Sequence, residues 1–192
     1  TSPMSLVNAT AYYGNIALTA SVTGTYPNFD QAADVIKLEK GKMFDSASSG
    51  NVVVIGPKLK TEAFGDTDAL GKTILINKTP FTVVGVIGEI SASSIFGSQF
   101  NSLAVIPFNT ATQMNKGTVT INEIIVKAAN DANVANVKTN IKKKVLTLHQ
   151  GEENFSAISL VCSKPSSPVI WITCNPFFSN QSMVPKKVVL IT

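Results

Sequence analysis

VVVIGPKLKTEAFGDTDALGKTILINKTPFTVVGVIG, residues 52–88, is the stretch of this chain that decides its fold. Its first apolar run, Val52–Ile55, predicts a strand buried on both faces, and the Gly-Pro pair that follows predicts a helix with proline in its first turn. Leu59 and Phe64 place apolar side chains on the inner side of this helix. Gly65 is expected to be the left-handed residue that ends it.

The second half of the stretch predicts a β-hairpin. Ile74 and Ile76 alternate with neighbours on the other face, four turn residues follow at 77–80, and a second strand covers 81–86. This ordered block contains almost no reactive side chains. It is therefore typical of a module that binds or transmits force rather than one that catalyses.

The same block carries a family resemblance. Three of its segments occur in a fixed order: 63–65 (AFG), 70–74 (LGKTI) and 81–86 (FTVVGV), with an acidic turn between the first two. This order resembles the extracytoplasmic core domain of MacB-like ABC transporter permeases. That family includes the lipoprotein-release permeases and, more distantly, FtsX.

The resemblance extends outward over roughly residues 5–160. Upstream, 22–24 (VTG) and 40–44 (KGKMF) are similar to the family's glycine-containing strand and its Gly-Arg-x-Phe turn, with lysine in place of arginine. Downstream, 105–107 (VIP) is similar to its Val-x-Ile/Val-Pro segment. Residues 121–156 resemble its closing strand, helix and strand.

The resemblance implies an α+β fold with mixed sheets. A strand-helix-hairpin subdomain at about 39–117 would be inserted into a β-α-β base, which would consist of residues 1–38 and 118–160 and lie nearest the membrane. Periodicity alone indicates only α+β. Residues 161–192 form a tail of uncertain origin outside the resemblance.

The resemblance also implies a function. The chain would be the extracytoplasmic domain of a cell-membrane ABC transporter permease, and it would use motion from a separate cytoplasmic ABC ATPase to export a substrate or act on an outer partner. The implied partners are that ATPase, a second permease subunit in a homodimer or heterodimer, and an extracytoplasmic adaptor or substrate protein. The alternative is a free-standing secreted binding or adhesive domain.

Length and composition suit one domain or two small subdomains. A chain of 192 residues buries about 70% of its unfolded surface without disulfides. Charged residues make up only 15%, yet there is no run of about eighteen predominantly apolar residues. The chain begins at Thr1 with no initiator Met or signal-peptide pattern, so we expect it to be excised from a longer protein or processed, with any membrane helices outside it.

The net charge of +4 does not predict nucleic-acid binding. All 16 basic residues are lysine, so the bidentate contacts that arginine makes with phosphate and guanine are excluded. Lys142, Lys143 and Lys144 lie in an amphipathic helix predicted at 131–149. We expect them to form a solvated helix face, with an anionic lipid surface as the functional alternative.

Gly65 to Thr73 resembles a phosphate-binding loop only superficially. Five residues, not four, separate Gly65 from the Gly71-Lys72 pair, and the segment follows a helix and enters a strand. That order is the reverse of the geometry that directs backbone N–H groups at phosphate. We therefore expect a structural turn, with Gly71 in a conformation closed to other residues and Leu70 packed into the core.

No catalytic, cofactor-binding or metal-binding residues are predicted. His149 is the only histidine and is interpreted as a helix cap, which leaves no base for a Ser-His-Asp or Cys-His arrangement. The carboxylate pairs Asp66/Asp68 and Glu152/Glu153 lie in predicted turns, where solvation or capping explains them. The chain is therefore predicted not to be an enzyme.

The two cysteines, Cys162 and Cys174, both lie in the tail. Their spacing establishes neither a disulfide nor a redox compartment. The apolar runs at 168–173 and 187–191 are candidates for strands added to an exposed sheet edge.

The N-terminal segment predicts a strand pair, 5–13 with 16–24, around a Gly-Asn turn. Asn28 is expected to cap a short helix or turn that continues through residue 35. The Ser/Gly/Asn-rich segment 91–102 predicts the most mobile loop of the chain.

Overall fold

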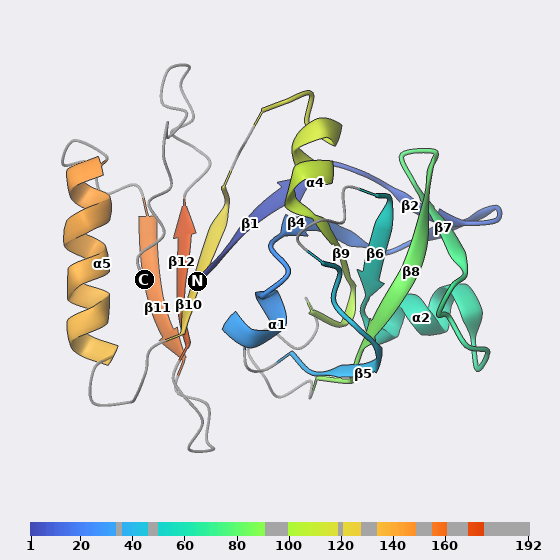
Figure 1. Ribbon diagram of the computed structural model, residues 1–192, viewed down its shortest axis with the longest axis horizontal. Coiled ribbons are helices and arrows are strands. Elements are labelled where there is room, and N and C mark those ends of the chain that lie inside the picture. Colours follow the sequence, from blue (N-terminus) through green and yellow to red (C-terminus); the bar gives the residue numbers. More distant parts are fainter. Residues whose placement is uncertain are drawn as a thin grey trace.

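The computed structural model describes residues 1–33, 36–45, 50–90, 100–118, 121–127, 134–148, 155–160 and 169–174. Figure 1 shows the path of the chain. The strands are β1 (Ser2–Val7), β2 (Ala11–Tyr13), β3 (Ile16–Leu18), β4 (Ser21–Thr25), β5 (Leu38–Gly41), β6 (Val52–Ile55), β7 (Thr73–Ile76), β8 (Thr79–Ile87), β9 (Leu103–Pro107), β10 (Glu123–Lys127), β11 (Phe155–Leu160) and β12 (Val169–Cys174). The helices are α1 (Phe29–Ala32), α2 (Pro57–Phe64), α4 (Phe108–Met114) and α5 (Val134–Leu148).

The described strands form one mixed sheet. Its order is β11-β12-β10-β1-β4-β9-β6-β8-β7-β2-β3, and β5 pairs with β8 beside this path. The pairs β4–β9 and β6–β8 are parallel, whereas the other pairs are antiparallel. A mixed sheet with packed helices confirms the predicted α+β class.

The N-terminal strand pair forms as predicted but divides into two parts. β2 pairs with β3 around the Gly-Asn turn, and β1 pairs with β4 below it. Residues 8–10 and 19–20, which belong to no strand, separate these parts. The outer part pairs with β7, with Tyr12 opposite Leu75, so it lies at the far end of the sheet from β11.

The block at 52–88 contains the elements that its sequence predicts, in the predicted order: strand, helix, turn and hairpin. α2 begins with Pro57 in its first turn and buries Leu59, Ala63 and Phe64. Gly65 follows with φ +57° and ψ −127°, a region open to glycine but distinct from the left-handed helix that was expected.

The hairpin turn is shorter than predicted. Asn77 and Lys78 form a two-residue turn with φ of 48° and 67°, and the next two residues already belong to β8. The Asn77 N–H donates to the Thr10 carbonyl, and the Thr10 N–H donates to Asn77 Oδ1. These long-range bonds hold the tight turn, and they depend on residues far away in the sequence.

Leu70 does not pack into the core, contrary to the prediction. It is 36% exposed, whereas its neighbour Ala69 is 1% exposed. The reason is the hydrogen bonding of the turn, because Asp68 Oδ1 accepts from the Leu70 N–H and the Gly71 N–H donates to the Val83 carbonyl. Gly71 has φ +75°, a conformation that glycine adopts readily and other residues rarely do, as predicted.

Asn28 precedes α1 but does not cap it, so this prediction is also wrong. Its side chain makes no capping hydrogen bond, and its Nδ2 donates instead to the Thr1 carbonyl at 3.2 Å. The helix is a single turn, Phe29–Ala32. Tertiary contact with the N-terminal strand thus competes successfully with the local cap.

Apolar side chains fill both faces of the sheet. One cluster lies under α2 and α4 and includes Val53, Ile55 and Ile106. The other lies under α1 and includes Val54 and Val105. Alternate residues of β6 and β9 thus point into different cores, which explains why these strands are continuously apolar.

The strand from the tail lies inside the sheet and not at its edge. β12 pairs antiparallel with both β10 and β11, so β10 and β11 run parallel to each other with β12 between them. Helix α5 connects them and buries Ile141 against Ile170 and Ile172 of β12. The run at 168–173 was a candidate for a strand added to an exposed edge; β12 forms here, but between β10 and β11, where it is paired on both sides.

Several predicted features can be placed only in part. Lys142, Lys143 and Lys144 lie on the exposed side of α5, which confirms a solvated face. Most of the predicted loop 91–102 falls outside the described residues.

Gly24 provides a test of how closely α4 packs on the sheet. A Cβ at this position would overlap the Cβ of Ala111 on α4. We expect Gly24→Ala to lower the free energy of unfolding by about 1–3 kcal/mol in denaturant melts, because the helix must move away. Gly50→Ala is the control, since no atom lies within 4 Å of a Cβ there.

The double variant Gly24→Ala/Ala111→Gly separates crowding from other effects. It should recover part of the loss, because the second change removes the overlapping methyl group. Simple additivity of the two single losses would contradict close packing of α4 on Gly24.

Glu123 on β10 gives a pH-dependent prediction. Burial raises the pKa of its carboxyl above the ordinary value of 4.5, so the folded state favours the neutral form. At low pH the carboxyl is neutral in both the folded and the unfolded state, and its burial costs no charge. As pH rises through the folded pKa, the folded protein must ionise a buried carboxyl and therefore loses stability. We expect Glu123→Gln to be more stable than wild type at pH 7, and the difference to shrink as pH falls through the raised folded pKa and to be gone at about pH 4.5 and below. An unchanged difference across this range in urea melts would refute the prediction.

Candidate functional site

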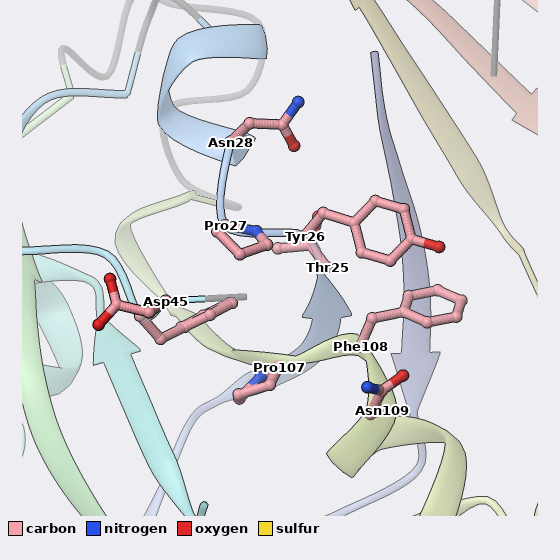
Figure 2. Close-up of a pocket in the computed structure, with 9 residues that line it drawn as sticks. Thr25, Tyr26, Pro27, Asn28, Asp45, Pro107, Phe108 and Asn109 are labelled. Carbon is pink, nitrogen blue, oxygen red and sulfur yellow. The ribbon is translucent and has the colours of Figure 1, made fainter. Parts of the chain in front are cut away.

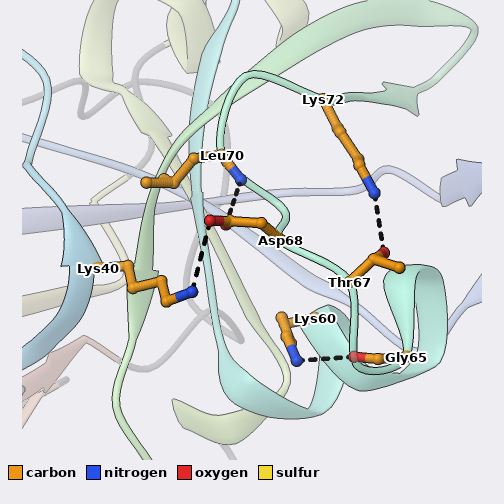
Figure 3. Close-up of polar contacts among 7 residues, drawn as sticks. All are labelled: Lys40, Lys60, Gly65, Thr67, Asp68, Leu70 and Lys72. Atoms are coloured by element: carbon orange, nitrogen blue, oxygen red, sulfur yellow. Dashed lines mark hydrogen bonds and ion pairs between the residues drawn. The ribbon is translucent and has the colours of Figure 1, made fainter.

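The glycine-rich turn after α2 brings together most of the residues that the sequence singles out (Figure 3). Lys72 Nζ donates to Thr67 Oγ1 at 2.8 Å and lies 5.2 Å from the centroid of the Phe64 ring. Lys60 Nζ donates to the Gly65 carbonyl at 2.7 Å. Both ammonium groups therefore stabilise the end of α2 and the turn that follows it.

Asp68 is the acidic member of the same turn. Its Oδ1 accepts from the Leu70 N–H at 3.1 Å, and its Oδ2 lies 3.4 Å from Lys40 Nζ. The Leu70 N–H, with a smaller contribution from Lys40, lowers the pKa of Asp68 below its ordinary value. The carboxylate is fully exposed, so this arrangement orders the turn without creating a buried reactive group.

This geometry favours a structural role for the turn. Its lysines donate to protein oxygens or pair with Asp68, and Gly71 donates its N–H to the carbonyl of Val83 on β8. A phosphate loop directs several free backbone N–H groups at one point, which this turn does not do.

The remaining candidate residues are dispersed or lie outside the described part of the chain. Among the described residues, no three His, Cys, Asp or Glu side chains come together as a metal ligand set. His149, Glu152, Glu153 and Cys162 fall outside the described residues. Cys174 ends β12, but its side chain is not described.

The structure forms a hollow that the sequence did not predict. We call it the strand-end hollow (Figure 2). It has a volume of about 400 Å³. Its walls come from the residues after β4, after β5 and at the end of β9: Thr25, Tyr26, Pro27, Asn28, Phe44, Asp45, Pro107, Phe108 and Asn109.

The hollow exists because two parallel strands end together and their continuations separate. Thr25 of β4 is opposite Pro107 of β9, so both chains leave the sheet at the same edge. α1 then packs Phe29 into one core, while α4 packs Ala111 into the core on the other face. A crevice opens where neighbouring parallel strands connect to opposite faces, and ligands commonly bind at such a point in α/β sheets.

Aromatic and proline side chains line the hollow. The rings of Tyr26 and Phe108 contact each other with centroids 5.1 Å apart and planes at 59°. Figure 2 shows Pro27 and Pro107 on opposite sides of the hollow. The sequence places an aromatic residue next to a proline where each of these strands ends, at 26–27 and 107–108. Nothing in the sequence indicated that the two strands are neighbours.

Comparison with known proteins identifies the class of domain. Residues 1–144 match the family described as the MacB-like periplasmic core domain. The chain belongs to this family of ABC transporter permease domains, as its motifs predicted.

Particular relatives carry the same match. The macrolide export ATP-binding/permease protein MacB of Neisseria gonorrhoeae is 33% identical over 159 residues, 80% of this chain. The pyoverdine export ATP-binding/permease protein PvdT of Pseudomonas aeruginosa is 32% identical over 146 residues, 74% of this chain. The chain spans only 24% and 22% of the lengths of these relatives.

Solved structures share the fold. The periplasmic region of MacB from Actinobacillus actinomycetemcomitans has a TM-score of 0.64 and 24% identity, over 78% of this chain and 66% of that one. The extracellular domain of the noncanonic ABC-type transporter YknZ from Gram-positive bacteria has a TM-score of 0.63 and 18% identity, over 79% and 76%. None of the helices in the described stretches has the length and apolar character needed to cross a membrane.

Lys72 tests the structural interpretation of the turn. We expect Lys72→Ala to lower the free energy of unfolding by about 0.5–1 kcal/mol, because it removes the bond to Thr67 and the contact with the Phe64 ring. Neither wild type nor variant should bind ATP in calorimetry. Lys78→Ala, at the exposed hairpin turn, is the control for loss of one charge. Measurable ATP binding that disappears in Lys72→Ala would overturn the structural role.

Proposed function

We propose that this chain is the extracytoplasmic domain of an ABC transporter permease and that it transmits motion produced by a cytoplasmic ATPase. The observation that carries the proposal is the family match over residues 1–144. The turn after α2 supports it, because its lysine Lys72 donates to Thr67 within the protein. In this role the domain performs no catalysis. It uses the transmitted motion to export a substrate or to act on a partner outside the membrane.

The continuous sheet supports a role in transmission. Hydrogen-bonded strands run in one path from β11 beside α5 to the β2–β3 hairpin at the opposite end. α4 packs closely on it, since a Cβ at Gly24 of β4 would overlap the Cβ of Ala111 on this helix. Tightly packed interiors deform little, so displacement at one end is passed to the other.

The proposed partners follow from the same role. One is the ATPase, which would act through the membrane-spanning part of the permease. A second permease subunit, identical or related, would complete the transporter, and an adaptor or substrate protein would contact the domain outside the membrane. The names of relatives mention macrolides and pyoverdine, and we assign neither substrate to this chain.

The test places a bioorthogonal label at position 78, in the exposed turn between β7 and β8, within the complete transporter. An added membrane-impermeant reagent should reach the label in intact cells, because the domain lies outside the cytoplasm. With the transporter in lipid nanodiscs, the label-to-label distance between two subunits should change when ATP is added. A transporter with a hydrolysis-deficient ATPase is the control and should stop at one distance.

The two readouts can fail separately. Labelling only after cell lysis would contradict the extracytoplasmic location. Correct labelling with a distance that is unaffected by nucleotide would contradict the transmission of motion.

A further inference from the structure

We propose that a second hollow, at the point where β10 leaves β1, binds a small carboxylate whose body carries an amide and an apolar side chain, as in an N-acylated amino acid. This site is a feature of the chain itself and does not depend on the proposed function. We call it the asparagine hollow. Its volume of about 430 Å³ lies in the usual range for small-molecule sites. Its lining includes Leu6, Asn8, Met114, Asn115, Lys116 and Asn122.

The hollow forms because β10 leaves β1 before β1 ends (Figure 1). β10 pairs with β1 only from Ser2 to Met4, whereas β4 pairs with β1 as far as Val7. On the side that β10 has left, two side chains bond to the backbone of Leu6 in place of a strand. The Leu6 N–H donates to Asn122 Oδ1 at 2.8 Å, and Asn115 Nδ2 donates to the Leu6 carbonyl at 3.3 Å.

These two bonds fix the orientation of each side-chain amide. A backbone N–H needs an acceptor, so Asn122 presents Oδ1 to Leu6 and keeps both Nδ2 hydrogens for another partner. A carbonyl needs a donor, so Asn115 keeps its Oδ1 and one N–H. The hollow therefore contains donors and an acceptor that are already ordered, which lowers the entropy cost of binding a ligand.

Lys116 supplies a positive charge to the same lining. It follows α4 with φ +57°, and its side chain is exposed. With the described residues this side chain forms no ion pair or hydrogen bond, so its ammonium group is available to an anion. The end of α4 opposes an anion only weakly, because the carbonyls of residues 111–113 already accept the N–H groups of residues 115–117.

A carboxylate suits this combination of groups. One oxygen can accept from the Lys116 ammonium group and the other from Asn122 Nδ2, and hydrogen bonds to an ionised partner are stronger than neutral ones. An amide next to the carboxylate finds both an acceptor and a donor on Asn115.

The apolar residues of the lining favour an apolar side chain on the ligand. Leu6 is 51% exposed, although β1 is an inner strand of the sheet. Met114 is half-buried and adds a second aliphatic side chain. A branched aliphatic group on the ligand would remove part of this surface from water.

The experiment titrates the full 192-residue chain with N-acetyl-leucine, N-acetyl-leucinamide and acetate, and follows backbone amide chemical shifts. We expect the largest shifts at residues 6–8, 114–117 and 122. N-acetyl-leucine should bind with a Kd on the order of millimolar, about threefold more tightly than the carboxamide, because an exposed ion pair contributes little. Acetate lacks the amide and the apolar group and should bind about tenfold more weakly. Added salt should bring the acid close to the carboxamide.

Lys116→Asn tests the charge. Asparagine tolerates a positive φ, so the variant removes the ammonium group without straining the backbone. It should abolish the preference for N-acetyl-leucine over the carboxamide. Lys78→Asn is the matched control, because Lys78 is also exposed and has φ +67°, but lies in the turn between β7 and β8. It should leave the preference unchanged.

Asn122→Asp separates ligand binding from simple capping of β1. The variant keeps an oxygen that accepts the Leu6 N–H but replaces the Nδ2 donors by a negative oxygen. It should weaken N-acetyl-leucine about fivefold and the carboxamide less, with the amide spectrum of the folded protein retained. Asn15→Asp, the same change at an exposed residue between β2 and β3, should alter neither affinity.

Other results would overturn the proposal. Equal affinities for the acid and the carboxamide, acetate as tight as N-acetyl-leucine, shifts that map elsewhere, or no shifts at the solubility limit would each show that the hollow is not such a site. Retention of the acid preference in Lys116→Asn and Asn122→Asp would show that these side chains do not recognise the carboxylate.

Discussion

The parallel pairing of β4 with β9 is the interaction on which the rest of the structure depends. It joins the N-terminal hairpin to the middle block through five register pairs, from Ser21 with Leu103 to Thr25 with Pro107. Without this ladder, β1, β10, β12 and β11 would have no continuous connection to β6, β8 and β7. Gly24 is essential to the arrangement because any larger residue there would push α4 away from the sheet.

The same pairing places a core on each face of the sheet and leaves the hollow at its edge. β4 and β9 end at the same edge of the sheet, and the helices that follow them, α1 and α4, pack on opposite faces. The sheet gains a core on each side. The edge between the two connections is left uncovered, and its aromatic and proline residues form the strand-end hollow.

Local features of the chain were predictable because neighbouring residues produce them. Gly56-Pro57 starts α2, the alternation of Ile74 and Ile76 gives β7, and Gly71 adopts a positive φ. Two of the predictions that were wrong concern groups whose distant partners outcompete local ones. Asn28 donates to Thr1 instead of capping α1, and the turn at Asn77 tightens because Thr10 bonds to it.

The sequence by itself determined the class of fold, the order of the central elements and the family, because hydrophobic periodicity, glycine and proline act over a few residues. Only the tertiary structure decided which strands are neighbours: β4 with β9, β2 with β7, and β12 between β10 and β11. The sequence also could not place Tyr26 beside Phe108, residues more than eighty positions apart whose rings meet 5.1 Å from each other. The physical reason is that strand pairing satisfies backbone groups that every residue possesses, so side-chain pattern alone does not specify the partner.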